Sequence, residues 1–439
     1  MSHRPLFRAP LIRTAAALLS GELPVNEYLE QVRARIEQIE PDVRAFVPEA
    51  DRWQRLRREV AALEARTSDG ADRPPLYGIA VGVKDCFRVD GLPTRAGSAL
   101  PPALFDGLEA SVVTALRAAG AIILGKTTMD EFAYSEPAAT RNPHNLDHTP
   151  GGSSSGSAAA VAAGLCPLAL GTQTSRSVIG PAAFCGVVGY KPSFGRIEID
   201  GVIPLAPSFD TVGMFTQDVA GTLLAASILI PDWRSIDEPR RPVLGVPEGT
   251  FLTWTLDVGH QAFEQQLARL AEAGLEIRRI SFFAAAELEE MDRRAMTLLH
   301  GEMARVHAEW FRQYPDRYRP RTARAIQRGQ AIDERELAAC RAYRQPFRAQ
   351  VEALMRDAAV DLWVTPASAG PAPAGLDVTG WGGMTTAWSY AGLPCATVPA
   401  GRDSAGLPLG LQGVAPSGQD EELLAWMRQL EAVFAAALE

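Results

Sequence analysis

Apolar and polar positions follow two different rhythms along this 439-residue chain. Residues 11–66 place apolar side chains at helical spacing between charged ones, as in VNEYLEQVRARIEQIE and WQRLRREVAALEAR. This pattern predicts two or three amphipathic helices joined at Glu40-Pro41. Because each helix has one apolar face, we expect these helices to form a scaffold over a core.

From Pro74 onward the pattern changes to short apolar runs of strand length. The runs GIAVGVKD and AIILGKT are typical of buried strands, and EASVVTALRAAG between them is typical of a helix. Strands that alternate with helices predict an α/β fold. Residues 285–355 return to a charged, almost wholly helical pattern, and we expect most of their aromatic side chains to serve packing: Trp310, Phe311, Tyr314, Tyr318 and Tyr343.

Lys84 is a lone ammonium inside the apolar run GIAVGVKD. Lysine is rarely buried without a reason, and burial without an acid partner lowers its pKa. On spacing alone, a surface lysine at a strand end is the preferred interpretation. Asp85 points to the opposite face if the strand continues. Lys126, which closes the run AIILGKT, is expected to be structural.

The stretch from Thr149 to Pro192 holds two serine-rich clusters, GGSSSGS and TQTSRS, and contains no Asp, Glu or His. The first cluster matches the G-x-S-x-G turn of α/β-hydrolases, but the residues before it cannot form the strand that this turn requires. A hydroxyl nucleophile needs a base. Without a nearby histidine, a neutral lysine acting through a bridging hydroxyl is the alternative, and Lys84 is the candidate.

Composition narrows the function classes. The net charge of −9 argues against a nucleic-acid partner. His144 and His148 lie in a proline-bounded loop and no metal-binding motif is present, so no metal or other cofactor is expected. The five cysteines form no CxxC pair, which favours reduced, buried thiols in a cytoplasmic protein. No apolar run is long enough to span a membrane, and Arg4, Arg8 and Arg13 argue against a signal peptide.

Beyond these patterns, the chain resembles the amidase signature family. The motifs that carry the resemblance run in the family's order: PLYGIAVGVKD, GLPTRAGS, LRAAGAIILGKTTMDEFA, TPGGSSSGSAAAVAAG, GTQTSRS, PAAFCGVVGYKPSFGRI, SFDTVG, VTPASAGPAP, YAGLPCATVPAG and LPLGLQGV. The resemblance implies an α/β fold whose mixed β-sheet core is covered by helices on both faces. It also implies a catalytic triad in which Ser177 is the nucleophile, Ser153 is a bridging serine after a cis peptide bond, and Lys84 is the base.

The same resemblance implies that backbone N–H groups of Thr174, Ser175 and Arg176 form an oxyanion hole, and that Tyr134 and Arg176 contact substrate. Relatives usually carry Gly before the nucleophile and Arg three residues after it. This chain has Arg176 and Gly180 at those positions, as if the two had been exchanged. Either Arg176 keeps the backbone geometry and reaches into the pocket or to the surface, or it blocks the oxyanion hole. Gln173, where many relatives have Asp, is a milder departure. The glycine-rich segment 380–386 is a candidate mobile loop.

We therefore expect one amidase domain over residues 1–439: N-terminal helices (1–70), a signature core (74–230), a helical cap insertion (285–355) and a C-terminal part of the core (360–439). The expected function is cofactor-independent hydrolysis of linear amides, with esters and carbamates (urethanes) as related substrates, by a monomer or homodimer. One alternative is the A-type subunit of a glutamine amidotransferase, which needs partner subunits; the short chain argues against it. Another is a relative that binds amides without catalysis.

Overall fold

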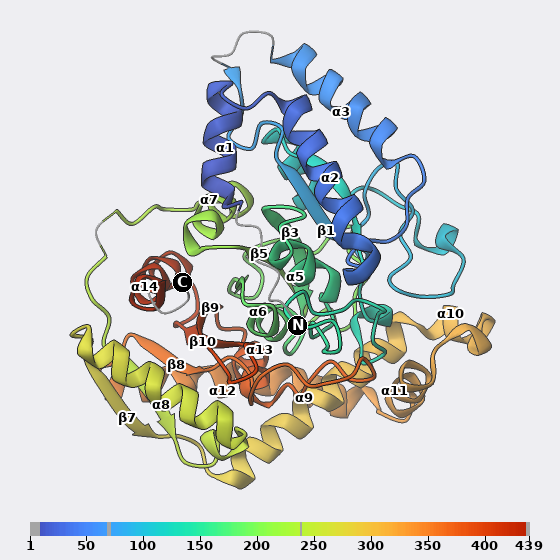
Figure 1. Ribbon diagram of the computed structural model, residues 1–439. Helices are drawn as coiled ribbons and strands as arrows, with labels where there is room; N and C mark the ends of the chain where they lie inside the picture. Colours follow the sequence, from blue (N-terminus) through green and yellow to red (C-terminus); the bar gives the residue numbers. More distant parts are fainter. Residues whose placement is uncertain (1–8, 68–71, 238, 436–439) are drawn as a thin grey trace.

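The computed structural model describes residues 9–67, 72–237 and 239–435, so Arg4 and Arg8 lie outside it. Ten strands form one sheet in the order β2-β1-β3-β5-β4-β9-β10-β8-β6-β7 (Figure 1). The strands are β1 (Ala80–Lys84), β2 (Ile122–Thr127), β3 (Leu168–Gln173), β4 (Val188–Lys191), β5 (Thr211–Thr216), β6 (Leu244–Glu248), β7 (Ile277–Ser281), β8 (Leu362–Pro366), β9 (Cys395–Arg402) and β10 (Pro408–Val414).

The sheet is mixed, with parallel pairing at both ends and antiparallel pairing in the middle. β1 pairs in parallel with β2 and β3, and β6 pairs in parallel with β7 and β8. The strands between these two groups run antiparallel to their neighbours. All residues of β1, β2 and β3 are buried, as their continuous apolar sequences predict.

Helices cover both faces of this sheet. On β10, a Cβ added to Gly410 would meet Ala183, whereas one added to Gly413 would meet Met427. Because positions three apart on a strand face opposite sides, the helices α6 (Ile179–Cys185) and α14 (Asp420–Ala435) lie on opposite faces. The helix α5 (Ser155–Ala162) packs against α6, while α7 (Val219–Leu229) and α8 (Asp257–Glu272) pack against α14. The predicted α/β class with a doubly covered mixed sheet is confirmed.

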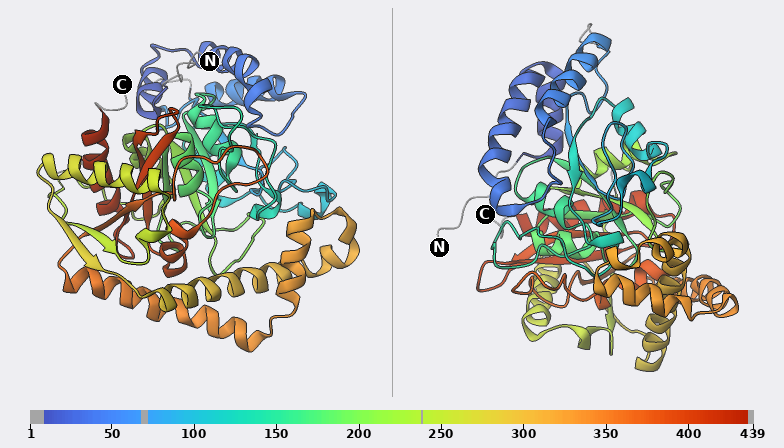
Figure 2. Two further views of the ribbon diagram at one scale, coloured as in Figure 1. Left: turned by 60° about the horizontal axis from the view of Figure 1, so that its bottom comes forward. Right: turned by 90° about the vertical axis from the view of Figure 1, so that its right-hand side faces the viewer.

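The remaining helices lie at two ends of the molecule. Helices α1 (Leu11–Ser20), α2 (Val25–Val43), α3 (Arg52–Arg66) and α4 (Ser111–Ala118) belong to the N-terminal half, and α1 to α3 lie at the top in Figure 1. Helices α9 (Ala285–Val306), α10 (Ala308–Gln313), α11 (Pro320–Gln330) and α12 (Glu334–Asp357) lie at the other end (Figure 2). The short helix α13 (Gly383–Ala391) packs against α9 and α12.

The prediction that Glu40-Pro41 separates two helices is wrong. Helix α2 continues through Pro41 and ends two residues later at Val43. A proline so close to the end of a helix removes only one hydrogen bond of the last turn, so the helix tolerates it. All five cysteines are buried and unpaired, as predicted. In the described ranges, no helix has both the length and the apolar character that crossing a bilayer requires.

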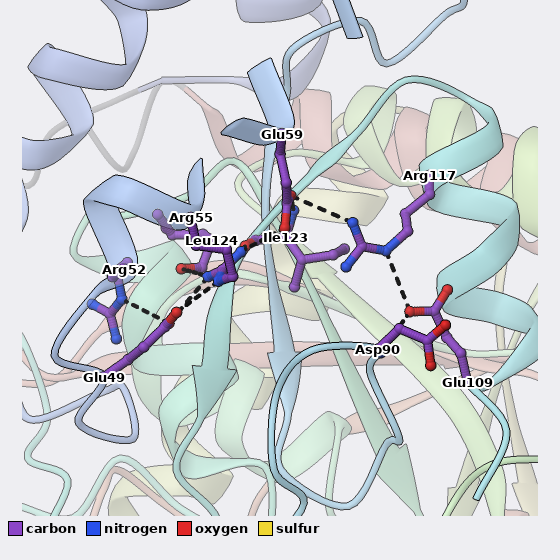
Figure 3. Close-up of polar contacts among 9 residues, drawn as sticks. All are labelled: Glu49, Arg52, Arg55, Glu59, Asp90, Glu109, Arg117, Ile123 and Leu124. Carbon is purple, nitrogen blue, oxygen red and sulfur yellow. Dashed lines mark hydrogen bonds and ion pairs between the residues drawn. The ribbon is translucent and has the colours of Figure 1, made fainter. Parts of the chain in front are cut away.

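Strand β2 forms one edge of the sheet, and charged side chains of α3 cover it (Figure 3). Arg55 Nη1 donates to the carbonyl oxygen of Ile123 at 2.8 Å, and Glu59 accepts the N–H of Ile123 at 3.2 Å. Glu49 and Glu59 hold Arg55 in place at 2.6 and 2.7 Å. An open strand edge invites pairing with another chain, so this cluster both satisfies and shields the edge.

Candidate active site

Lys84 is the last residue of β1, and the sheet register brings it to Thr172. Val83 is paired with Leu170 on the parallel strand β3, so the carboxyl ends of the two strands, with Lys84 and Thr172, lie side by side. Lys84 Nζ lies 2.8 Å from Ser153 Oγ and 2.7 Å from Thr172 Oγ1. The lysine side chain is fully buried, so its surroundings consist of protein groups. The surface interpretation of Lys84 is therefore wrong.

The surroundings of Lys84 lower its pKa and so disfavour its charged form. Burial lowers the pKa of Lys84, while Cys86 and the carboxylates of Asp130 and Asp210 act in the opposite direction. Both carboxylates are themselves buried. Burial raises the pKa of Asp130 to about 7 and that of Asp210 to about 6. Near neutral pH these acids carry less negative charge than ordinary aspartates, so they oppose the loss of the lysine proton only weakly.

Ser153 stands in the tight turn that leads into α5. The Gly152–Ser153 peptide bond is cis, as the resemblance predicted. The N–H of Asp130 donates to the carbonyl oxygen of Ser153 at 3.2 Å. The Asp130 carboxyl also explains why position 152 is glycine, because a Cβ there would lie 2.2 Å from Asp130 Oδ2. The turn therefore aims the Ser153 hydroxyl at Lys84 with no room for a side chain behind it.

Ser177 lies in the loop between β3 and α6, and buried side chains hold this loop at both ends. Gln173 Oε1 accepts the N–H groups of Val178 and Ile179 at 2.8 and 2.9 Å, and its Nε2 donates to Ser389 at 2.8 Å. Thr174 Oγ1 donates to Asp210 at 2.5 Å. Ser177 itself is buried but reaches the cavity described below.

Arg176 directs its side chain away from the serines, toward the segment before α13. Its Nη1 donates to the carbonyl oxygen of Thr379 at 2.6 Å, and its Nη2 donates to Thr379 Oγ1 at 2.8 Å. Arg176 does not have a positive φ, so its backbone conformation is not strained in the way that the exchange with glycine could have required. Burial lowers the pKa of Arg176 and the Asp130 carboxylate raises it.

Ser153 and Ser177 line one cavity of about 290 Å³. Its walls come from six regions of the chain: Ala133, Tyr134 and Ser135; Gly152 and Ser153; the loop 174–177; Leu205; Asp292, Met296 and Leu299; and Gly380, Trp381, Gly382, Gly383 and Thr386. Tyr134 Oη lies 2.9 Å from His300 Nε2, and burial lowers the pKa of His300 to about 4, so this histidine is neutral near pH 7. A larger cavity of about 620 Å³ elsewhere contains none of the predicted triad residues.

The cavity brings together every residue that the sequence proposed for substrate contact and the oxyanion hole. Tyr134, Thr174, Ser175 and Arg176 all line it, together with most of the predicted glycine-rich segment 380–386. That segment is only partly a loop, since α13 begins at Gly383. Lys84 lies behind Ser153, outside the cavity wall.

The other candidates have structural roles. Lys126 forms a buried ion pair with Asp85 at 2.9 Å, on the far side of β1 from Ser153. His144 and His148 each place a ring nitrogen 2.8 Å from a backbone carbonyl oxygen, of Cys185 and Ala372 respectively. Trp310 and Tyr318 pack around Phe132 and His307, as expected of packing aromatics.

Two residues that support the site were missed at the sequence level. Thr172 contacts Lys84, and Gln173 fixes the loop that carries Ser177. Both lie at the end of β3, and the only available signal was their position beside the cluster TQTSRS. Gln173 was noted only as a lost charge, whereas its amide makes three buried hydrogen bonds that a carboxylate cannot all form.

Comparisons with known proteins agree with this geometry. The profile of the Amidase family matches residues 27–424. The A-type subunit of glutamyl-tRNA(Gln) amidotransferase from Thermus thermophilus is 33% identical over 93% of this chain and 94% of that protein. The corresponding protein of a Synechococcus species is 31% identical over 94% and 95%.

Solved structures give the same result. A crystal structure described as an amidase superposes with a TM-score of 0.89 at 31% identity, covering 97% of this chain and all of that one. The peptide amidase of Stenotrophomonas maltophilia superposes with a TM-score of 0.81 over 98% of both chains; its 24% identity supports the fold alone. The family profile, the relatives and the fold agree over most of the chain. The chain belongs to the amidase signature family, whose members are hydrolases acting on carbon–nitrogen bonds.

Proposed function

We propose that this protein is a serine amidohydrolase that cleaves small linear amides through an acyl-enzyme on Ser177, with esters and carbamates as chemically related substrates. One observation carries the proposal: a buried lysine with a lowered pKa contacts Ser153, and Ser153 shares a small cavity with Ser177. A lysine of this kind acts as a base, and a serine next to a base becomes a nucleophile.

The proposed first step forms the acyl-enzyme. Neutral Lys84 Nζ accepts the proton of the Ser153 hydroxyl while Ser153 Oγ accepts the proton of Ser177, whose Oγ attacks the substrate carbonyl carbon. The backbone N–H groups of Thr174, Ser175 and Arg176 face the resulting oxyanion. Each such donor contributes about 2.7–4 kcal/mol to transition-state stabilisation. The proton on Lys84 returns through Ser153 to the leaving amine as the carbon–nitrogen bond breaks.

The second step returns the enzyme to its starting state. Water attacks the acyl carbon, its proton passes to Lys84 through Ser153, and the ester bond to Ser177 breaks with the return of that proton to Ser177 Oγ. The Thr172 hydroxyl accepts one of the lysine N–H bonds in both steps and so keeps the nitrogen lone pair directed at Ser153. No cofactor takes part in this sequence.

The direct test is Ser177→Ala assayed with an activated anilide. The proposal expects turnover to fall by about three orders of magnitude or more, because the covalent route is lost. Ser227→Ala, on the exposed side of α7, is the matched control and retains full turnover. Substantial turnover by the Ser177→Ala protein would contradict the assignment.

A second candidate function is that of an amidotransferase A-type subunit. Two relatives that bear this name favour it, because they are 31–33% identical to this chain over nearly their whole length. Such a protein releases ammonia from glutamine for a partner. A glutaminase assay of the isolated protein, with and without an ammonia acceptor, distinguishes this role from independent hydrolysis of other amides.

A non-catalytic amide-binding role was raised because Arg176 precedes Ser177. The geometry argues against obstruction, since the guanidinium is held at Thr379. Stoichiometric labelling of Ser177 by a fluorophosphonate would exclude the non-catalytic role.

The five unpaired cysteines suit a reducing compartment, and we place the protein in the cytoplasm on that ground.

A further inference from the structure

The cavity at Ser177 is lined by a carboxylate with which no cation of the described residues forms an ion pair. Only two of the residues that line it are charged at neutral pH, Arg176 and Asp292. Arg176 donates from both terminal nitrogens to Thr379 and lies within electrostatic reach of the Asp130 carboxylate. Both terminal nitrogens of its guanidinium are therefore already engaged within the protein. This leaves Asp292 as the charge available to a ligand.

Asp292 has no cation of its own in the described part of the chain. It lies on α9, and the two arginines that follow it, Arg293 and Arg294, both bind Glu290 instead, at 2.8 and 2.6 Å. Asp292 shares its helix face with Met296 and Leu299, the other α9 residues that line the cavity, because residues four and seven positions along a helix lie on the same side. The carboxylate is solvent-exposed at this cavity wall.

Two aromatic side chains, Trp381 and Tyr134, line the same cavity as Asp292. Tyr134 is fixed by its contact with His300, and Trp381 packs against Trp254 with a centroid distance of 5.5 Å while 56% of its surface stays exposed. Aromatic faces attract cations, tryptophan most strongly, and a carboxylate adds a full charge to that attraction.

We propose that Asp292, together with the aromatic wall at Trp381, selects substrates that carry a cationic group, an ammonium or guanidinium, within reach of the scissile bond. This inference rests on the proposed function of Ser177 as the nucleophile. The volume of the cavity, about 290 Å³, sets the scale of the substrate: a small amide with one charged group rather than a long apolar chain.

The test compares two fluorophosphonates that differ in one group, a terminal trimethylammonium or the isosteric, neutral tert-butyl. Both report on Ser177 without requiring amide turnover. We expect the cationic probe to label the protein about tenfold faster, since an exposed ion pair and a cation–π contact each contribute up to about 1 kcal/mol. Asp292→Asn lowers this ratio about fivefold, and Asp292→Lys inverts it.

Glu289→Gln is the matched control, because Glu289 is an exposed acid on the same helix that does not line the cavity. It leaves the ratio unchanged. Equal labelling by the two probes, or an equal loss of preference in the Glu289→Gln protein, would overturn the proposal while Ser177 remains the nucleophile. If neither probe labels Ser177, the proposed function itself fails, and the substrate preference built on it fails with it.

Discussion

At the residue scale, the central feature of the site is the fully buried side chain of Lys84. Lys84 has a serine and a threonine hydroxyl within 2.8 Å, and no carboxylate forms an ion pair with it in the described chain. The two carboxylates that act on its pKa, Asp130 and Asp210, are buried and have raised pKa values. The same burial that raises the pKa values of these acids lowers the pKa of the lysine, as the proposed role of Lys84 as a base requires.

This arrangement predicts the direction of the pH dependence. Protonated Lys84 cannot accept a proton from Ser153, so kcat/KM should fall as the pH drops through the Lys84 pKa and reach a plateau above it. Because burial lowers that pKa, the midpoint should lie below the ordinary lysine value of about 10.4. The measurement is a pH profile of kcat/KM on a neutral amide.

Asp130→Asn provides the control for this profile. Ionisation of Asp130, with a pKa of about 7, favours the protonated lysine, so its removal should shift the acidic limb to lower pH. A profile that is flat, or that rises toward acid, would contradict the role of Lys84 as the base.

Gln173 is a positioning residue whose effect is also predictable. Gln173→Leu removes the acceptor of the Val178 and Ile179 N–H groups, while the Ser389 hydroxyl loses one donor but still donates to the Ser175 carbonyl oxygen. Each unsatisfied buried group costs about 1–3 kcal/mol. We expect a lower thermal midpoint together with a fall in kcat of about tenfold or more.

Gln173→Glu keeps the acceptor for Val178 and Ile179 and should recover most of the stability. Near-normal values of both kcat and thermal midpoint in the Gln173→Leu protein would show that the loop is held by other contacts.

At the element scale, the segment before α13 depends on the loop that carries Ser177. Arg176 fixes Thr379, and the following residues Gly380, Trp381 and Gly382 line the cavity. Gly383 is in close contact with Trp381, since a Cβ at position 383 would lie 1.9 Å from the indole ring. The nucleophile loop and the cavity wall are therefore coupled through one guanidinium.

Arg176→Gly should consequently raise KM. The substitution frees Thr379 and loosens the wall that carries Trp381, while the triad stays in place, so kcat should change little. The measurement is steady-state kinetics on a cationic and a neutral amide. A large rise in kcat would instead support obstruction of the oxyanion hole by Arg176.

At the scale of the whole molecule, the strand that carries the proposed base lies next to a protected edge of the sheet. β1, which ends in Lys84, pairs with the edge strand β2, and the α3 cluster holds β2 through Arg55 (Figure 3). Arg55→Met leaves the Ile123 carbonyl without this donor and removes the closest cation of Glu49 and Glu59, which keep only their longer contacts with Arg52 and Arg117. We expect a loss of about 3 kcal/mol of stability, measured by chemical unfolding.

Arg57→Met, on the exposed side of α3, is the control and should change the unfolding midpoint little. Equal effects of the two substitutions would show that the Arg55 cluster does not stabilise the sheet edge.

The sequence alone predicted those features that depend on local hydrophobic patterns or on the order of the family's motifs. The strands at Lys84 and Lys126 follow from apolar runs, and the proposed triad follows from motifs that keep the family's order. Thr172, Gln173 and Asp292 could not be found that way, because their roles depend on which residues the sheet register and α9 bring together. The helix end predicted at Pro41 was two residues too early, because a proline marks the end of a helix only to within a few residues.

The most direct test of the central claim is peptide mass mapping of the enzyme quenched with acid during turnover of an activated ester. The account predicts one acyl group, located on the peptide that contains Ser177 and absent from the Ser177→Ala protein. An acyl group on another residue, or steady turnover without any covalent intermediate, would contradict it.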